Sequence, residues 1–177
     1  MTTVESTRLI ELTDSIRERV RRGESQARTA ELVEDALSPF LSEPGLLRED
    51  QRRGDSSRYV QHVLHVEPDG GFSVVALVWL PGQETPVHDH VAWCVTGVYE
   101  GTETEQRYEL RDADSHLVPV QEVTNERGSV CGFAPPGDIH LVRNSGTAKA
   151  ISIHVYGADI GSLGTSVRRH YDLPVLS

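Results

Sequence analysis

Apolar residues recur at two different periods along this chain, and the change falls near residue 54. In residues 7–23, and again from Ser25 to about Pro39, apolar positions lie three or four residues apart, which predicts two amphipathic helices. Ser25 is a typical helix N-cap, while Gly23 and Pro39 are typical helix ends. The apolar positions are Leu9, Leu12, Ile16 and Val20 in the first helix and Ala30, Val33, Ala36 and Leu37 in the second.

After residue 54, short runs with strand-like patterning are separated by Gly, Pro, Asn and Asp residues that favour turns. Many short strands with frequent turns predict a mainly β protein, either a sandwich or a barrel. At 177 residues we expect one structural domain overall: a helical segment, 1–54, packed on a barrel, 55–177, that carries a C-terminal extension. The predicted strands are 59–66, 72–80, 94–99, 103–110, 116–123, 130–133, 140–142 and 149–156.

Composition narrows the classes of partner. The net charge of -10 argues against a nucleic-acid partner, because a nucleic-acid-binding surface must be basic to replace counterions on phosphates. The chain has two cysteines, no apolar run near the length of a membrane span and no leader-like start. We therefore expect a cytoplasmic protein with no membrane partner and no disulfide framework, in a compartment where thiols stay reduced.

Candidate metal ligands begin with His88 and His90. Residues two apart on an extended strand project from the same face, so the two imidazoles could bind one metal ion. A third ligand must come from elsewhere. His140 is the best candidate, because it follows a proline-glycine turn and opens an apolar run.

The spacing around these histidines resembles the two signatures of the cupin family. Gly82, five residues, His88-x-His90, three residues, Cys94, six residues and Gly101 is similar to the first signature, and Pro-x4-His140-x3-Asn is similar to the second. The resemblance implies a cupin barrel, the jelly-roll or double-stranded β-helix fold. Most cupins have a ligating glutamate at the Cys94 position, so this site is expected to hold its metal with three neutral imidazoles.

A cysteine in place of this glutamate, here Cys94, resembles the cysteine dioxygenase family of cupin thiol dioxygenases. Ser152-Ile153-His154-Val155-Tyr156 is similar to the family's Ser-x-His-x-Tyr segment, whose alternate side chains form a hydrogen-bonded row near the iron. In some members a cysteine at the Cys94 position is covalently joined to the tyrosine at the Tyr156 position. Both residues are present here, and whether they are joined stays open.

Residues 58–61 and 167–171 resemble the bacterial branch, which includes 3-mercaptopropionate dioxygenases and carries glutamine, here Gln61, where the cysteine-specific branch carries a substrate-binding arginine. The resemblance implies that Gln61 and Arg168 receive the substrate carboxylate, although Arg58 or Arg169 could do so instead. The matches together cover about residues 58–171.

The resemblance implies an Fe(II)- and O2-dependent enzyme that oxidises a small carboxylate-bearing thiol, L-cysteine or 3-mercaptopropionate, to its sulfinic acid. Iron is expected on the three candidate histidines, with Tyr156, His154, Ser152 and Cys94 in catalytic positions. Its partners would be the small-molecule thiol and O2, and we expect a monomer or weak homo-oligomer. The alternatives are another metal-dependent cupin enzyme and a non-catalytic cupin that senses a small molecule. The remaining histidines, His62, His65, His116 and His170, are expected at the surface or in packing contacts.

Overall fold

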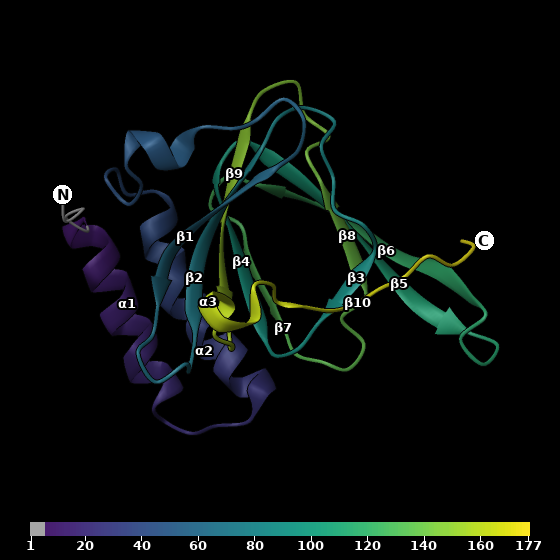
Figure 1. Cartoon of the computed structure of the whole chain (residues 1–177), viewed down its shortest axis with the longest axis horizontal. Coiled ribbons are helices and arrows are strands. Elements are labelled where there is room, and N and C mark those ends of the chain that lie inside the picture. The colour runs from purple at the N-terminus through teal and green to yellow at the C-terminus, as the bar shows by residue number, and fades with distance from the viewer. Residues whose placement is uncertain (1–5) are drawn as a thin grey trace.

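The computed structural model describes residues 6–177 as two facing β-sheets with the N-terminal helices against one of them (Figure 1). The helical sheet, named for the helices that cover it, has the order β1-β2-β9-β4-β7, and the second sheet has the order β10-β3-β8-β5-β6. The helices are α1 (Thr7–Val20), α2 (Gln26–Leu37), η1 (Ser38–Leu41), η2 (Glu49–Arg52) and α3 (Ile160–Leu163). The strands are β1 (Val60–Val66), β2 (Ser73–Trp79), β3 (His88–His90), β4 (Cys94–Glu100), β5 (Thr102–Arg111), β6 (His116–Glu126), β7 (Val130–Phe133), β8 (His140–Arg143), β9 (Ala150–Tyr156) and β10 (Val167–His170).

The two N-terminal helices form where the apolar period predicts them. The Ser6 hydroxyl accepts a hydrogen bond from the backbone N–H of Leu9 and caps α1, and Ser25 caps α2 in the same way. Both helices turn their apolar stripes toward the helical sheet, where Leu12 and Val33 are fully buried in one cluster with strand residues. Burial of this kind contributes roughly 1.5–3 kcal/mol for each large side chain, so the helices are part of the core.

The helical sheet is buried at its centre, where every residue of β2 and β9 is buried. These two strands pair along their whole length, from Ser73 opposite Tyr156 to Trp79 opposite Ala150. One face of the pair packs under the helices, and the other faces the second sheet across the inside of the barrel. The predicted fold class, mainly β with a cupin jelly-roll barrel and a small N-terminal helical segment, is confirmed.

Gly101 shows why a glycine closes the first signature. Its φ is +76°, and a Cβ at this position would lie 2.7 Å from the backbone oxygen of Lys149. Other residues rarely adopt this conformation, and here the neighbouring chain also leaves no room for a side chain. The turn from β4 into β5 therefore brings two strands of different sheets together beside β9.

The sequence pattern did not predict β3, β10 or α3 as elements. β10 is an edge strand with a register shift between Val167 and Arg169, so its residues do not alternate regularly between apolar and polar. It pairs antiparallel with β3 and brings residues 165–170 to the mouth of the barrel. Among residues 6–177, the helices are all too short or too polar to cross a membrane.

Candidate metal centre and active-site pocket

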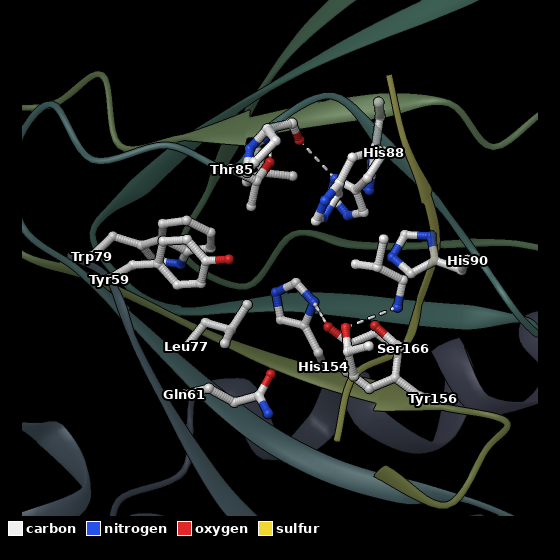
Figure 2. Close-up of a pocket in the computed structure, with 16 residues that line it drawn as sticks. Tyr59, Gln61, Leu77, Trp79, Thr85, His88, His90, His154, Tyr156 and Ser166 are labelled. Carbon is white, nitrogen blue, oxygen red and sulfur yellow. Dashed lines mark hydrogen bonds between the residues drawn. The ribbon is translucent and has the colours of Figure 1, made fainter. Parts of the chain in front are cut away.

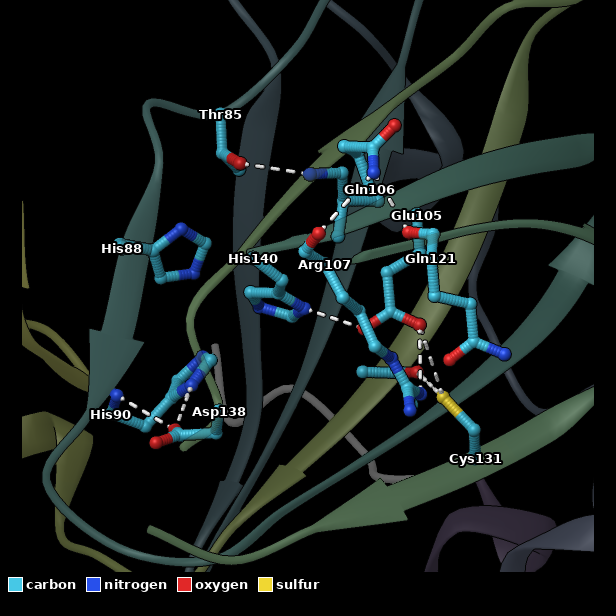
Figure 3. Close-up of polar contacts among 12 residues, drawn as sticks. Thr85, His88, His90, Glu105, Gln106, Arg107, Gln121, Cys131, Asp138 and His140 are labelled. Carbon is cyan, nitrogen blue, oxygen red and sulfur yellow. Dashed lines mark hydrogen bonds and ion pairs between the residues drawn. The ribbon is translucent and has the colours of Figure 1, made fainter. Parts of the chain in front are cut away.

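Three histidines from two strands of the second sheet meet at the inner end of a pocket (Figure 3). His88 and His90 lie on β3, and His140 lies on β8 directly opposite His88 in the register of the pair. The ring centroids are 4.8 Å apart for His88 and His90, 4.7 Å for His88 and His140, and 5.1 Å for His90 and His140. Their candidate ligand atoms all lie within 4.8 Å of one another, so the structure brings together the three ligands that the sequence predicted.

Each of the three rings is oriented by a hydrogen-bond acceptor at Nδ1. The Nδ1–H of His88 donates to the Pro86 carbonyl at 2.9 Å, that of His90 to Asp138 Oδ2 at 3.0 Å, and that of His140 to Glu105 Oε1 at 2.7 Å. A proton held at Nδ1 leaves the lone pair at Nε2 free for a metal ion. Carboxylates and carbonyls in this position are the usual outer partners of metal-bound histidine, because they fix the tautomer and the ring orientation.

The electrostatics keep the His88 imidazole neutral and the Glu105 carboxylate ionised. Burial, reinforced by the rings of His140 and His90, lowers the pKa of His88 to about 2. Burial alone would raise the pKa of Glu105, but its hydrogen bond from His140 and its contact with Arg107 lower that pKa to about 2 overall. Neutral imidazole is the form that binds metals, so protonation of His88 does not compete with metal binding at neutral pH.

The donor set fits a divalent transition-metal ion. Within residues 6–177, Nε2 of His140 is a buried nitrogen with no hydrogen-bond partner, which would be costly if nothing bound it. Among those same residues the cluster contains three histidines and no carboxylate ligand. Imidazole suits iron, zinc, copper and nickel, and three neutral donors leave the full charge of the metal available to an anionic substrate group.

The pocket in front of the histidines is small and mixed in polarity (Figure 2). Its cavity volume is about 60 Å³, which suits a small ligand. Tyr59 stacks on Trp79 with ring centroids 4.6 Å apart and forms one wall. Further lining residues are Gln61, Leu77, Thr85, Pro86, Val142, His154, Tyr156, Thr165, Ser166, Val167 and His170.

A row of polar side chains on β9 faces the metal ligands from the helical sheet. Ser152 Oγ lies 2.9 Å from His154 Nε2, and His154 Nδ1 lies 3.1 Å from the Tyr156 hydroxyl. The ring of Tyr156 stacks against His90 with centroids 5.9 Å apart, so its end of the row reaches the metal centre. Burial lowers the pKa of His154 to about 3 and raises that of Tyr156 well above its usual range, so both are neutral near pH 7.

Cys94 lies beside this row without lining the pocket. It is fully buried on β4 and sits directly opposite Tyr156 in the β4–β9 register. Cβ atoms of such a pair are typically about 4.5–5.5 Å apart. Burial raises the pKa of the Cys94 thiol well above its ordinary value, so the thiol is protonated.

The two predicted carboxylate-binding residues lie in different places. Gln61 lines the pocket from β1. The side chain of Arg168 is 56% exposed, pairs with Asp89 and does not line the pocket. Of the alternatives, Arg58 lines a wider hollow that shares Tyr59 and Gln61 with the pocket, whereas Arg169 stacks on a tyrosine outside it.

Several site residues were not predicted. His170, expected at the surface or in packing, is exposed but also lines the pocket. Asp138 and Glu105 hold two of the histidines, and Glu105 shares a strand face with Glu103. Two buried acidic residues at alternate strand positions are a signal that could have been used, because carboxylates are rarely buried without a role.

Comparison with known proteins agrees with the fold and identifies the family. A double-stranded β-helix domain protein from Klebsiella pneumoniae is similar with a TM-score of 0.50 and 20% identity, covering 66% of this chain and 87% of its own. An RmlC-like cupin protein from Desulfovibrio desulfuricans has a TM-score of 0.45 and 24% identity, covering 66% of this chain and 95% of its own. The family described as cysteine dioxygenase type I matches residues 1–163. With this match over most of its length, the chain belongs to the cysteine dioxygenase type I family.

Proposed function

We propose that this protein is an Fe(II)-dependent thiol dioxygenase that adds both atoms of O2 to the sulfur of a small carboxylate-bearing thiol, L-cysteine or 3-mercaptopropionate. The observation that supports this most is the ligand set: among residues 6–177, three neutral histidines meet without a carboxylate ligand, opposite a buried Tyr156. Ferrous iron held there would offer open coordination positions to a thiolate and to O2 side by side.

The chain's own residues supply orientation and charge balance. Asp138 and Glu105 hold His90 and His140 with Nε2 turned inward. Because the three ligands are neutral, an anionic sulfur is a better match for the centre than it would be beside a carboxylate ligand. Tyr156, positioned by His154, provides a hydroxyl at the pocket wall, and removing one such positioned donor typically costs about 10²- to 10³-fold in rate.

For the substrate carboxylate we propose the mouth of the pocket around Gln61. Gln61 offers a neutral amide, and Arg58 lies in the adjoining hollow with a guanidinium that can bind a carboxylate through two hydrogen bonds. Arg168 would have to leave Asp89 to take this role. The comparison of Arg58→Ala with Arg168→Ala tests the assignment: the variant that raises the Michaelis constant for the carboxylate thiols, while leaving that for cysteamine unchanged, identifies the binding residue.

The function itself is tested by loading the protein with Fe(II) and incubating it in air with cysteine, 3-mercaptopropionate or cysteamine. The expected result is thiol-dependent O2 uptake and a sulfinate product, identified by a mass increase of two oxygen atoms, with cysteamine the poorest substrate. Zinc-loaded protein is the matched control, because zinc is not redox-active and should support no O2 uptake. Stoichiometric iron without thiol-dependent O2 uptake would contradict the proposal.

A further inference from the structure

Glu103 is a buried carboxylate that the proposed reaction has not used. It lies on β5 with 3% of its surface exposed, and its Oε1 has no hydrogen-bond partner within residues 6–177. The Ser152 hydroxyl and the Trp79 indole lie close enough to its carboxylate to lower its pKa, against the effect of burial. Glu103 therefore stands at the buried end of the row whose other end, Tyr156, lines the pocket.

When Glu103 is ionised, the donors and acceptors available along the row determine which group donates in each hydrogen bond. The indole N–H of Trp79 can only donate, and it donates to Ser152 Oγ at 3.1 Å. The single proton of Ser152 is then available to the nearby carboxylate, which is an acceptor only. His154 must donate to Ser152 from Nε2 and accept the Tyr156 proton at Nδ1.

Protonation of Glu103 reverses the bonds from Glu103 through Ser152 and His154 to Tyr156, while the bond from Trp79 to Ser152 keeps its direction. A neutral carboxyl group donates to Ser152, so Ser152 donates to His154 Nε2 and the proton of His154 moves to Nδ1. Nδ1–H then donates to the Tyr156 oxygen, which leaves the Tyr156 proton free to point into the pocket. The tautomer of His154 therefore reports the charge of Glu103.

We propose that Glu103 is the proton store of the Tyr156–His154–Ser152 row, taking up the proton that a thiol loses when it binds in the pocket as a thiolate. This inference rests on the proposed function, and it assigns to the same site the destination of the substrate proton. The route is internal because Glu103 is shielded from solvent and the row connects it to the pocket.

The transfer is balanced and needs no other reactant. The thiol proton goes to the Tyr156 oxygen while the Tyr156 proton moves to His154 Nδ1. The Nε2 proton of His154 moves to Ser152, and the Ser152 proton moves to Glu103. The net change is one thiol and one carboxylate becoming one thiolate and one carboxylic acid, and the reverse sequence releases the proton when the product leaves.

The surroundings of Glu103 support a change of charge near neutral pH. Burial raises the pKa of Glu103 to about 7, Ser152 and Trp79 oppose the rise, and the negative charge of Glu105 on the same strand adds to it. On β6 its register partner is the neutral Asn125, and on β9 the ionisable groups are His154 and Tyr156, both neutral at this pH. On β8, the charged Arg143 is turned toward Glu122 on the exposed side of the sheet.

The first test uses metal-free protein and does not depend on activity. In protein labelled with ¹⁵N-histidine, two-bond NMR correlations identify which ring nitrogen of His154 carries the proton. The tautomer should change from Nδ1–H at about pH 6 to Nε2–H at about pH 8 in the wild type. Glu103→Gln and Ser152→Ala should each show a single tautomer at both pH values. A tautomer that does not change in the wild type, or that still changes in Glu103→Gln, would overturn the inference.

The second test measures protons released when a thiol binds anaerobically to the iron-loaded enzyme at about pH 8, where a thiol with a pKa of about 8.5 is mostly protonated. The time course of release is followed with a pH indicator. In the wild type the proton should reach the solution more slowly than the thiol binds, because Glu103 takes it up first and, with a pKa of about 7, loses it to solvent afterwards. In Glu103→Gln the release should keep pace with binding. The control is Glu109→Gln on the same strand, an exposed residue paired with Arg111, which should behave as the wild type. Release that keeps pace with binding in both the wild type and Glu103→Gln would contradict the inference.

Turnover adds a third readout that a purely structural role would not change. The wild-type kcat/KM should fall below about pH 7, and in Glu103→Gln the inflection should move to that of the free thiol, at about 8.5, because only preformed thiolate can then bind. An unchanged inflection would again contradict the inference. If no thiol is oxidised by any form, the proposed function fails, and the tautomer measurement still decides whether Glu103 controls the row.

Discussion

Asp138→Asn should weaken metal binding while leaving the fold intact. In the wild type one carboxylate oxygen accepts hydrogen bonds from both the backbone N–H and the Nδ1–H of His90, each at 3.0 Å. These bonds hold the ring with Nε2 toward the other two histidines. Asparagine has nearly the same shape but no charge, and its NH2 group can face His90 and favour the wrong tautomer.

The size of the effect on metal affinity follows from the loss of a charged hydrogen-bond acceptor for His90. Asp138 is ionised because, although burial alone would raise its pKa, the two bonds from His90 lower it overall. Loss of a carboxylate partner of a metal-bound histidine typically reduces metal affinity about 10- to 100-fold, which corresponds to about 1.4–2.7 kcal/mol. The side chain is almost fully buried, so water cannot replace the missing acceptor.

The assay is anaerobic competition for Fe(II) or Co(II) against a chromophoric chelator, with thermal unfolding of the metal-free protein measured in parallel. The matched control is Asp50→Asn, because Asp50 is 61% exposed and pairs with Arg48 at the surface. The control should bind metal as the wild type does. An Asp138→Asn protein with wild-type affinity, within about twofold, would refute the argument that this carboxylate orients His90 for the metal.

Three further predictions concern the ligand set, the helical segment and the turn after β4. His140→Ala should leave the protein with less than stoichiometric metal by elemental analysis, and full retention would remove it from the ligand set. The hydrogen bond from Arg17, opposed by burial and assisted by His65, lowers the pKa of Glu67 to about 2, below the unfolded value of 4.5. The contribution of Glu67 to stability is therefore present above pH 4.5 and is lost as the pH falls toward 2. Because Arg17 is 25% exposed and the pair is partly screened, Glu67→Gln should cost about 2 kcal/mol in urea unfolding near pH 7 and almost nothing near pH 2; equal costs would contradict this. Gly101→Ala should lower the free energy of unfolding by about 2–4 kcal/mol, through backbone strain plus a steric clash. Gly82→Ala, with φ of +80° and no atom within 4 Å of the new Cβ, should lower it by only about 1–2 kcal/mol. Equal losses in the two variants would refute the clash at Gly101.

Regular periodicity explains which parts of the fold could be predicted. The helical stripe ending at Val20 has a clear period because one face is buried, and β2 and β9 are apolar-rich runs bounded by turn residues because they are buried along their whole length. β3 has only three residues, and β10 is an irregular edge strand, so neither is long enough or regular enough to show a period. These two short strands nevertheless place His88 and close the mouth of the pocket.

The candidate site could likewise be predicted from the sequence only in part. The spacing of His88, His90 and His140 indicated the metal ligands, because strand geometry converts spacing into a shared face. Their partners Glu105 and Asp138 could not be assigned, because the contacts span 35 and 48 residues and depend on how the strands pair. The direction of an exposed side chain such as Arg168 is likewise set by a local partner, here Asp89, and not by the motif around it.

The two sheets carry different halves of the proposed chemistry. The metal ligands stand on β3 and β8 of the second sheet, while Tyr156, His154 and Ser152 stand on β9 of the helical sheet. A substitution between the sheets can change their separation while leaving each half internally intact. Such a variant would bind its metal with native affinity and hold its tyrosine correctly, yet turn over slowly, because the reacting groups would no longer meet across the gap. Metal content and catalytic competence are therefore separable properties of this barrel, and each must be assayed by itself.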